Sequence, residues 1–126
     1  MSKFAFSAPN AAPPVGPYSP AVAAVGFVFL SGQIPIDGEG SVVGDTAAEQ
    51  ARQAMENMQA LMRNTGLSMA DVVKTTIFLT DIADFAAVND VYAGYFEPPY
   101  PARSTVQVAA LPKGVKVEIE ATAMRG

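Results

Sequence analysis

Apolar residues recur along this chain with two different periods, one typical of helices and one typical of strands. From Thr46 to Gly66 they return every three or four positions, which predicts a helix with one buried face. Thr46 and Glu49 have the spacing of a capping box, and glycine is the residue that most often ends a helix. Residues 85–96 carry a second stripe of the same period behind Asp84, a predicted N-cap, and a pair of prolines follows the stripe. The pattern therefore predicts two amphipathic helices.

Strands are predicted where β-branched and aromatic residues cluster or alternate with polar ones. These segments are 21–25, 27–30, 72–79, 104–109 and 115–123, with a short returning strand at 41–43. Strands, helix, strand, helix and two final strands are typical of an α+β sandwich: a two-layer fold with both helices on one sheet face. Because the chain has no linker and no internal repeat, residues 1–126 are expected to form a single domain.

The last two predicted strands each have a polar side. Val117, Ile119 and Ala121 alternate with glutamates, and Val106 and Val108 alternate with longer polar residues. If the apolar sides pack on the helices, the opposite sheet face collects Arg103, Thr105, Gln107, Glu118 and Glu120. A solvated outer face is the alternative, since alternating strands commonly have one.

Composition adds a surface argument. Half of the residues are apolar and only 16% are charged, against about 25% in a typical soluble domain. The shortage indicates that other subunits cover part of the surface; the alternative is a monomer of low charge. A net charge of −4 with scattered basic residues argues against electrostatically driven nucleic-acid binding. We expect no membrane span and no signal peptide, and the lack of cysteine is compatible with a cytoplasmic protein.

The residue types restrict the chemistry further. Without His or Cys, imidazole acid–base catalysis, thiolate nucleophiles and the usual zinc sites are excluded. Arg103 stands where a proline-ended loop enters a strand, and a guanidinium there can hold a small carboxylate with two parallel hydrogen bonds. An exposed salt-bridge arginine is the alternative.

Six short segments occur in a fixed order: Gly16-Pro17-Tyr18-Ser19, Ser31-Gly32-Gln33-Ile34-Pro35, Asn89-Asp90-Val91-Tyr92, Pro101-Ala102-Arg103-Ser104, Leu111-Pro112-Lys113 and Val117-Glu118-Ile119-Glu120-Ala121. Together they resemble the reactive intermediate deaminase family in its RidA branch, also called YjgF-type proteins. The resemblance extends over residues 9–124. It implies a chorismate-mutase-like fold in a homotrimer, with an inner barrel of sheets and three clefts between subunits.

The same resemblance implies an activity and a set of site residues. Members hydrolyse 2-imino acids, the tautomers of enamines such as 2-aminoacrylate, to 2-keto acids and ammonia, and no metal or organic cofactor is implied. 2-Iminopropanoate and 2-iminobutanoate are the expected substrates. The residues implied are Arg103 for the carboxylate, the Thr105 backbone amide beside it, Glu118 for the attacking water, the pocket residue Tyr18, and the pocket-lining Ser31, Gly32 and Asn89. Several relatives carry Cys in place of Thr105, which leaves the backbone contact unchanged but removes any thiol-based control.

Other interpretations of these residues remain open. Glu118 could simply pair with Arg103 or a lysine, and Tyr18 could be a buried packing residue. Asn89 could be only a helix-surface or loop-bonding amide, and Gly32 a residue that only admits a bend. The function has alternatives too: a trimer that binds carboxylates without catalysis, a ribonuclease or translation inhibitor, or a deaminase of a different substrate. The absence of His and the acidity argue against ribonuclease chemistry.

Overall fold

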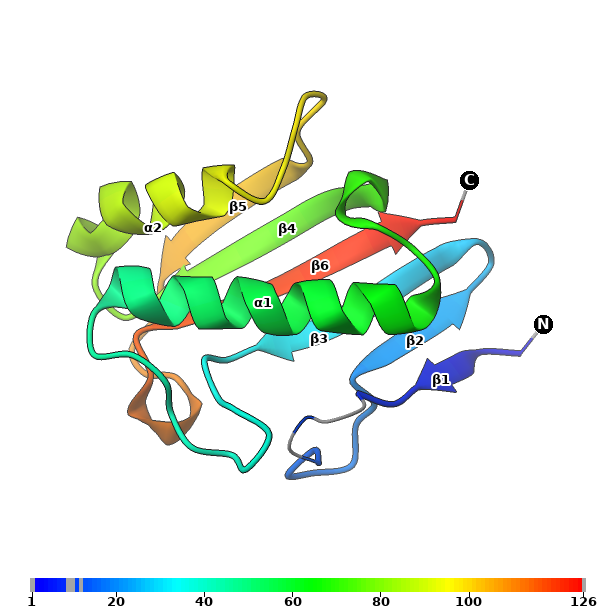
Figure 1. Ribbon diagram of the computed structural model, residues 1–126, viewed down its shortest axis with the longest axis horizontal. Helices are drawn as coiled ribbons and strands as arrows, with labels where there is room; N and C mark the ends of the chain where they lie inside the picture. Colours follow the sequence, from blue (N-terminus) through cyan, green and yellow to red (C-terminus); the bar gives the residue numbers. More distant parts are fainter. Residues whose placement is uncertain (1, 9–10, 12, 126) are drawn as a thin grey trace.

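A six-stranded mixed sheet carries both helices on one face (Figure 1). The structure is a computed structural model, and it describes residues 2–8, 11 and 13–125. The elements are β1 (Phe4–Phe6), β2 (Ala21–Ala24), β3 (Phe27–Gln33), α1 (Ala47–Thr65), β4 (Val72–Leu79), α2 (Phe85–Ala93), β5 (Ala102–Gln107) and β6 (Val117–Met124). The sheet order is β1-β2-β3-β6-β4-β5, and only the β4–β5 pair is parallel. The predicted two-layer α+β architecture is confirmed.

Local chemistry sets the ends of α1 as expected. The Thr46 hydroxyl accepts from the Glu49 amide at 3.1 Å, the Glu49 carboxylate accepts from the Thr46 amide at 3.0 Å, and Gly66 ends the helix at φ 82°. The start of α2 differs from the prediction, because the Asp84 side chain caps nothing. A 3₁₀ turn at Ile82–Asp84 precedes the helix, and the side chain of Asp81 caps that turn by accepting from the Ala83 amide at 2.9 Å.

Three further boundaries differ from the sequence prediction. The helix α2 ends at Ala93, three residues before the end of the apolar stripe, and Phe96 continues the buried surface from a non-helical backbone. The short strand predicted at 41–43 is reduced to one bridge between Ile36 and Val42. The strand β1 was not predicted, because three residues are too few to display a period.

The core lies between α1 and the sheet. Buried side chains from α1 pack on alternate residues of the central strands; the α1 set is Ala51, Ala54, Met55, Met58, Leu61 and Met62, and the β6 set is Val117, Ile119, Ala121 and Ala123. Full burial of a Leu, Ile or Met side chain contributes about 1.5–3 kcal/mol, so this layer dominates stability. Gln50 is buried beside it. The Gln50 side-chain amide donates to the Gly44 carbonyl, and its oxygen accepts from the Lys116 backbone amide. The core therefore fixes β6 relative to α1.

The orientation of β5 corrects one prediction. Its polar residues Arg103, Thr105 and Gln107 lie in register with Thr75, Ile77 and Leu79 of β4, which are buried on the helix side. They therefore face α2, while Glu118 and Glu120 pair with Phe78 and Thr76 on the open face. The expected common face for these polar groups is wrong. The reason is that α2 and the 3₁₀ turn before it offer them partners: the Ile82 amide of that turn, for example, donates to Gln107 Oε1 at 2.8 Å.

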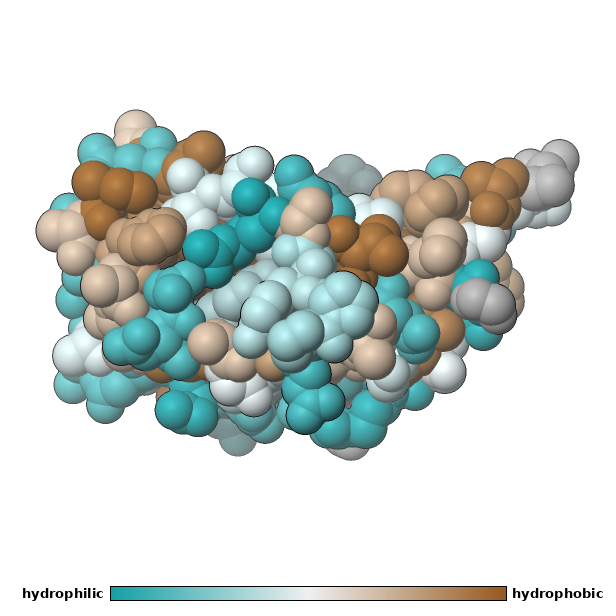
Figure 2. Space-filling model, turned by 90° about the horizontal axis from the view of Figure 1, so that it is seen from above, coloured by the Kyte–Doolittle hydropathy of each residue, from teal (hydrophilic) through white to brown (hydrophobic). Residues whose placement is uncertain are grey.

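Large apolar side chains remain exposed on two parts of the surface. On the open sheet face, Phe29 is 47% exposed and Val106 is 41% exposed. Ile82 and Phe85, at the start of α2, are also exposed, and Figure 2 shows hydrophobic surface at that end of the molecule. Among the described residues, no helix combines the length and the apolar character that crossing a membrane requires.

Candidate active site

Arg103 lies between β5 and α2, against two aromatic rings. Its guanidinium carbon is 4.9 Å from the centre of the Tyr92 ring and 5.5 Å from that of the Phe85 ring. Contacts of this kind contribute about 0.5–2 kcal/mol each, depending on desolvation. Within the described part of the chain, no carboxylate forms an ion pair with the guanidinium. The rings therefore hold the charged group without neutralising it.

Tyr92 is itself held in place by a hydrogen bond to β4. Its hydroxyl lies 2.7 Å from the Thr75 hydroxyl, and both residues are buried. Burial raises the pKa of Tyr92, while the hydrogen bond to Thr75 and the charge of Arg103 oppose the shift. The ring therefore stays neutral and presents its face to Arg103.

Two more residues predicted for the site lie in the same place. Thr105 is two residues after Arg103 on the same side of β5, and its Oγ1 is buried without a hydrogen-bond partner among the described residues. Asn89 stands on α2 four residues after Phe85 and three before Tyr92, so it shares their helix face. We call Arg103, Thr105, Asn89, Phe85 and Tyr92 the arginine cluster.

Glu118 belongs to a second cluster, around a bulge between β3 and β6. The pairing of these strands shifts between Leu30 and Gln33, and Gly32 lies in the shift. A Cβ built on Gly32 would lie 2.7 Å from the Glu118 carboxyl carbon and would overlap Oε2. Since φ of Gly32 is not in the left-handed region, the glycine is required by this close approach and not by a bend.

The environment of Glu118 changes its titration. Partial burial raises the pKa of Glu118 above that of an ordinary glutamate, and the negative charge of Glu120 raises it further. A carboxylate with a raised pKa is a better proton acceptor near neutral pH. The interpretation of Glu118 as a partner of Arg103 within one chain is wrong, because the two lie on opposite sheet faces.

Ser31 and Tyr18 complete this second group. The Ser31 hydroxyl donates to the Ser19 carbonyl at 2.7 Å, and the Ser31 amide donates to the Pro20 carbonyl at 2.9 Å. These bonds tie β3 to the loop that carries Tyr18. Tyr18 is 53% exposed, so it is not a packing residue of this chain. We call Glu118, Gly32, Ser31 and Tyr18 the glutamate cluster.

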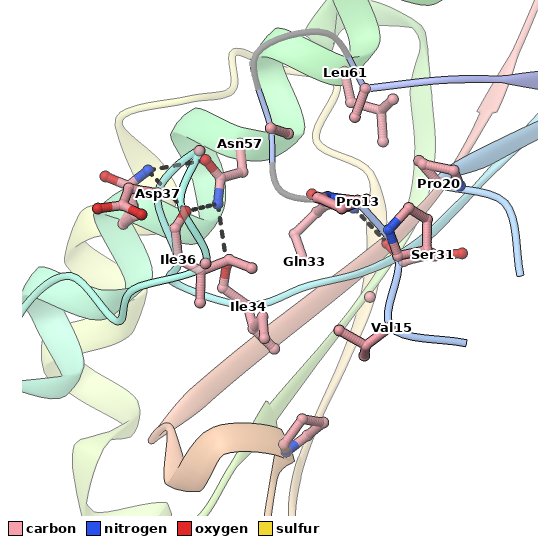
Figure 3. Close-up of a pocket in the computed structure, with 18 of the residues that line it drawn as sticks. Pro13, Val15, Pro20, Ser31, Gln33, Ile34, Ile36, Asp37, Asn57 and Leu61 are labelled. Atoms are coloured by element: carbon pink, nitrogen blue, oxygen red, sulfur yellow. Dashed lines mark hydrogen bonds between the residues drawn. The ribbon is translucent and has the colours of Figure 1, made fainter. Parts of the chain in front are cut away.

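A pocket of about 600 Å³ opens beside the glutamate cluster (Figure 3). Tyr18, Ser31 and Gly32 line it, together with the segment after β3 and one face of α1. Asn57 of α1 shapes this wall by donating to the Ile34 carbonyl at 3.0 Å and to the Ile36 carbonyl at 2.9 Å. Among the described residues that line the pocket there is neither Glu118 nor any member of the arginine cluster.

The two clusters are separated within one chain. In the sheet register, Glu118 pairs with Phe78 of β4, whereas Arg103 pairs with Thr75, so the two are two strands and three residues apart. At ~4.8 Å per strand and ~3.3 Å per residue, their Cα atoms are about 14 Å apart, with the sheet between their side chains. A small imino acid cannot contact both groups of one chain.

The sequence analysis gave no site role to two residues of the arginine cluster, although one of them, Tyr92, belongs to one of the six segments. Phe85 and Tyr92 contact Arg103, and their spacing of seven on one helix places them on one face. That spacing was available in the sequence, where both residues were assigned to the core stripe. Nothing in the sequence indicated that a cation would cover the stripe.

Comparisons with known proteins identify the family and the fold of the chain. A family model described as Endoribonuclease L-PSP matches residues 9–125. The chain is 47% identical over 113 residues to a human 2-iminobutanoate/2-iminopropanoate deaminase, covering 89% of this chain and 82% of the relative. It is 52% identical over 108 residues to the RutC family protein y4sK of Sinorhizobium fredii, covering 85% and 86%. The crystal structure of E. coli TdcF with bound serine matches at 43% identity with a TM-score of 0.90, covering 98% of this chain and 99% of that one.

The family model matches nearly the whole chain, and relatives share about half of its residues. These findings assign the chain to one family. The order and spacing of the six segments had indicated the same family. The chain belongs to the Endoribonuclease L-PSP family, the RidA or YjgF-type family that its motifs resemble.

Proposed function

We propose that this protein is a homotrimer whose clefts between subunits hydrolyse 2-imino acids to 2-keto acids and ammonia. In each cleft, the arginine cluster of one subunit faces the glutamate cluster of the next. The separation of the two clusters within one chain supports this arrangement, because it leaves each cluster with half of the required groups. The apolar side chains exposed at the start of α2 and on the open sheet face suit subunit contacts.

The proposal rests mainly on Arg103, which has no acidic partner among the described residues. A guanidinium held by two rings, with no acidic partner among the described residues, is ready to form a bidentate contact with a carboxylate. A 2-imino acid has a carboxylate next to its reactive carbon. Holding that carboxylate on Arg103 therefore fixes the position of the carbon that water attacks.

Glu118 supplies the second requirement. The carbon of the protonated imine is already electrophilic. A water molecule that loses a proton to the Glu118 carboxylate therefore adds to this carbon and gives a carbinolamine. Glu118 returns that proton to the nitrogen and then accepts the hydroxyl proton, so that the carbonyl forms as the C–N bond breaks. The proton finally passes from Glu118 to the released ammonia, which restores the carboxylate. One imino acid and one water thus give one keto acid and one ammonium ion. Tyr18 donates a hydrogen bond at the cleft wall, and Ser31, Gly32 and Asn89 shape it.

The names of relatives support the reaction and the substrate class. The human relative and one from Salmonella typhimurium, 46% identical over 119 residues, are both called 2-iminobutanoate/2-iminopropanoate deaminase. TdcF was solved with serine, an amino acid that carries the carboxylate expected at Arg103.

The test generates 2-iminopropanoate or 2-iminobutanoate in situ, with an amino acid oxidase or a dehydratase, and measures keto-acid release. We expect release to be faster than the uncatalysed hydrolysis, and we expect Arg103→Ala to abolish the acceleration. Binding of a keto acid without acceleration would support a carboxylate-binding trimer. Cleavage of RNA by the same preparation, with no effect on imines, would support the ribonuclease alternative.

Assembly is tested separately by native mass. A trimer has three times the 13.1 kDa mass of the chain. An active species at the mass of one chain, at micromolar concentration, would exclude clefts shared between subunits.

A further inference from the structure

A buried hydrogen-bonded pair lies directly beneath Arg103. The hydroxyls of Thr75 and Tyr92 are 2.7 Å apart, and the two residues are 1% and 6% exposed. Thr75 comes from β4 and Tyr92 from α2, so this bond links the sheet to the helix. A buried hydroxyl without a partner is costly, and each of these two satisfies the other.

The pair is connected to Arg103 by two independent contacts. Thr75 is the in-register neighbour of Arg103 across the β4–β5 pair. The Tyr92 ring lies 4.9 Å from the Arg103 guanidinium carbon. The Tyr92 ring also packs on Phe96, with ring centres 4.8 Å apart. The hydroxyl and the body of the ring are therefore both fixed.

An arginine has a long side chain with many rotamers, and a bidentate contact requires one of them. Part of the free energy of binding is lost if the side chain must be ordered when the ligand arrives. A ring that is already fixed provides a surface on which the guanidinium is ordered in advance. Phe85, whose ring centre is 5.5 Å from the guanidinium carbon, is 41% exposed and has no hydroxyl with which to form a bond like that of Tyr92.

We propose that Thr75 and Tyr92 are positioning residues for Arg103: their hydrogen bond fixes the Tyr92 ring, and that ring orders the guanidinium for a ligand carboxylate. This inference rests on the proposed carboxylate site at Arg103 and does not require hydrolysis. The carboxylate is held in both the bound substrate and the transition state, so the pair acts on KM and on keto-acid Kd more than on kcat.

A role in stability alone makes a different prediction, and a double variant separates the two. Tyr92→Phe keeps the ring but leaves the Thr75 hydroxyl unpaired, and Thr75→Val leaves the Tyr92 hydroxyl unpaired. Each single variant should therefore lower Tm by about 4–8 °C. The double variant Thr75→Val/Tyr92→Phe removes both hydroxyls of the pair, so neither is left buried without its partner, and most of the lost Tm should return.

The experiment measures Tm, the Kd of 2-ketobutanoate and steady-state imine hydrolysis for the wild type, both single variants and the double variant. We expect the double variant to bind 2-ketobutanoate about 3- to 10-fold more weakly, although its Tm recovers. In an Arg103→Lys background, the same pair of changes should leave the Kd of 2-ketobutanoate within about twofold of the value for Arg103→Lys alone, because the ordered guanidinium is already gone.

Two results would overturn the inference: a double variant whose Kd returns to the wild-type value together with Tm, or an equal loss of affinity in the Arg103→Lys background. If the wild type binds 2-ketobutanoate through Arg103 but hydrolyses no imine, the proposed function fails, and the positioning role is still decided by the Kd series. A wild-type trimer that binds no keto acid overturns both.

Discussion

If Glu118 positions the attacking water as proposed, Gly32→Ala is expected to lower the rate of imine hydrolysis by moving the Glu118 carboxylate. The added Cβ would lie 2.7 Å from the Glu118 carboxyl carbon and 3.0 Å from its Cγ, and it would overlap Oε2. Normal carbon–carbon contacts are about 3.5–4.0 Å, so the carboxyl carbon must move by about 1 Å. A displacement of ~1 Å of a group that positions a reactant lowers the rate about 100-fold, which corresponds to about 2.7 kcal/mol.

The fold should tolerate the change. The atoms in conflict are the end of a flexible side chain, and φ of Gly32 is outside the left-handed region. We therefore expect Tm and the Kd of 2-ketobutanoate to stay close to the wild-type values while kcat falls. Single-turnover keto-acid release, native mass and thermal unfolding measure the three quantities.

Gly94→Ala is the matched control, because its added Cβ would meet only the Val91 carbonyl oxygen, at 3.4 Å. It should keep wild-type turnover. A second control places Gly32→Ala in a Glu118→Gln background, where it should reduce turnover little further. Full turnover by Gly32→Ala alone would refute the reasoning, and so would a loss of Tm that accounts for the loss of activity.

Three other predictions concern the charged groups. Glu118→Gln should lower turnover and leave keto-acid binding nearly intact, with Glu120→Gln as the control on the same strand face; equal losses in binding and turnover would indicate a structural role. Because activity needs the ionised form of Glu118, its raised pKa should place the acid limb of the kcat/KM profile above the ordinary glutamate range. Glu120→Gln removes a neighbouring negative charge and should therefore move this limb to lower pH. A limb that does not move would contradict the prediction. Arg103→Ala should cost about 2–4 kcal/mol in transition-state binding, or roughly 30- to 1,000-fold in kcat/KM, and Arg103→Lys should restore little; full rescue by lysine would indicate a simple salt bridge.

Features with local causes were predictable from the sequence. The start and end of α1 follow from Thr46, Glu49 and Gly66, whose side-chain and backbone preferences act within a few residues. The buried side of β6 follows from the alternation of Val117, Ile119, Ala121 and Ala123 with the polar residues Glu118, Glu120 and Thr122. In both cases one strong local preference has no competitor.

The orientation of β5 could not be read in the same way. Val106 and Val108 oppose Arg103, Thr105 and Gln107, and the usual preference places the apolar side against helices. The structure reverses it because α2 supplies aromatic rings for Arg103, and the 3₁₀ turn before α2 supplies a backbone amide for Gln107. Partners that come from another element leave no periodic signal in the strand itself. Likewise, the motif identified Gly32, but only the β3–β6 register showed that Glu118 is what the glycine accommodates.

Placing Arg103 and Glu118 on opposite faces of one sheet has a genetic consequence. If clefts are shared between subunits, an Arg103→Ala allele still supplies a working glutamate, and a Glu118→Gln allele still supplies a working arginine. Two inactive alleles expressed together would then restore activity, with about one cleft in four carrying both intact groups when subunits mix at random. An active site contained in one chain would show no such complementation. The placement of these two side chains on one sheet thus predicts that two inactivating mutations in the same gene complement each other.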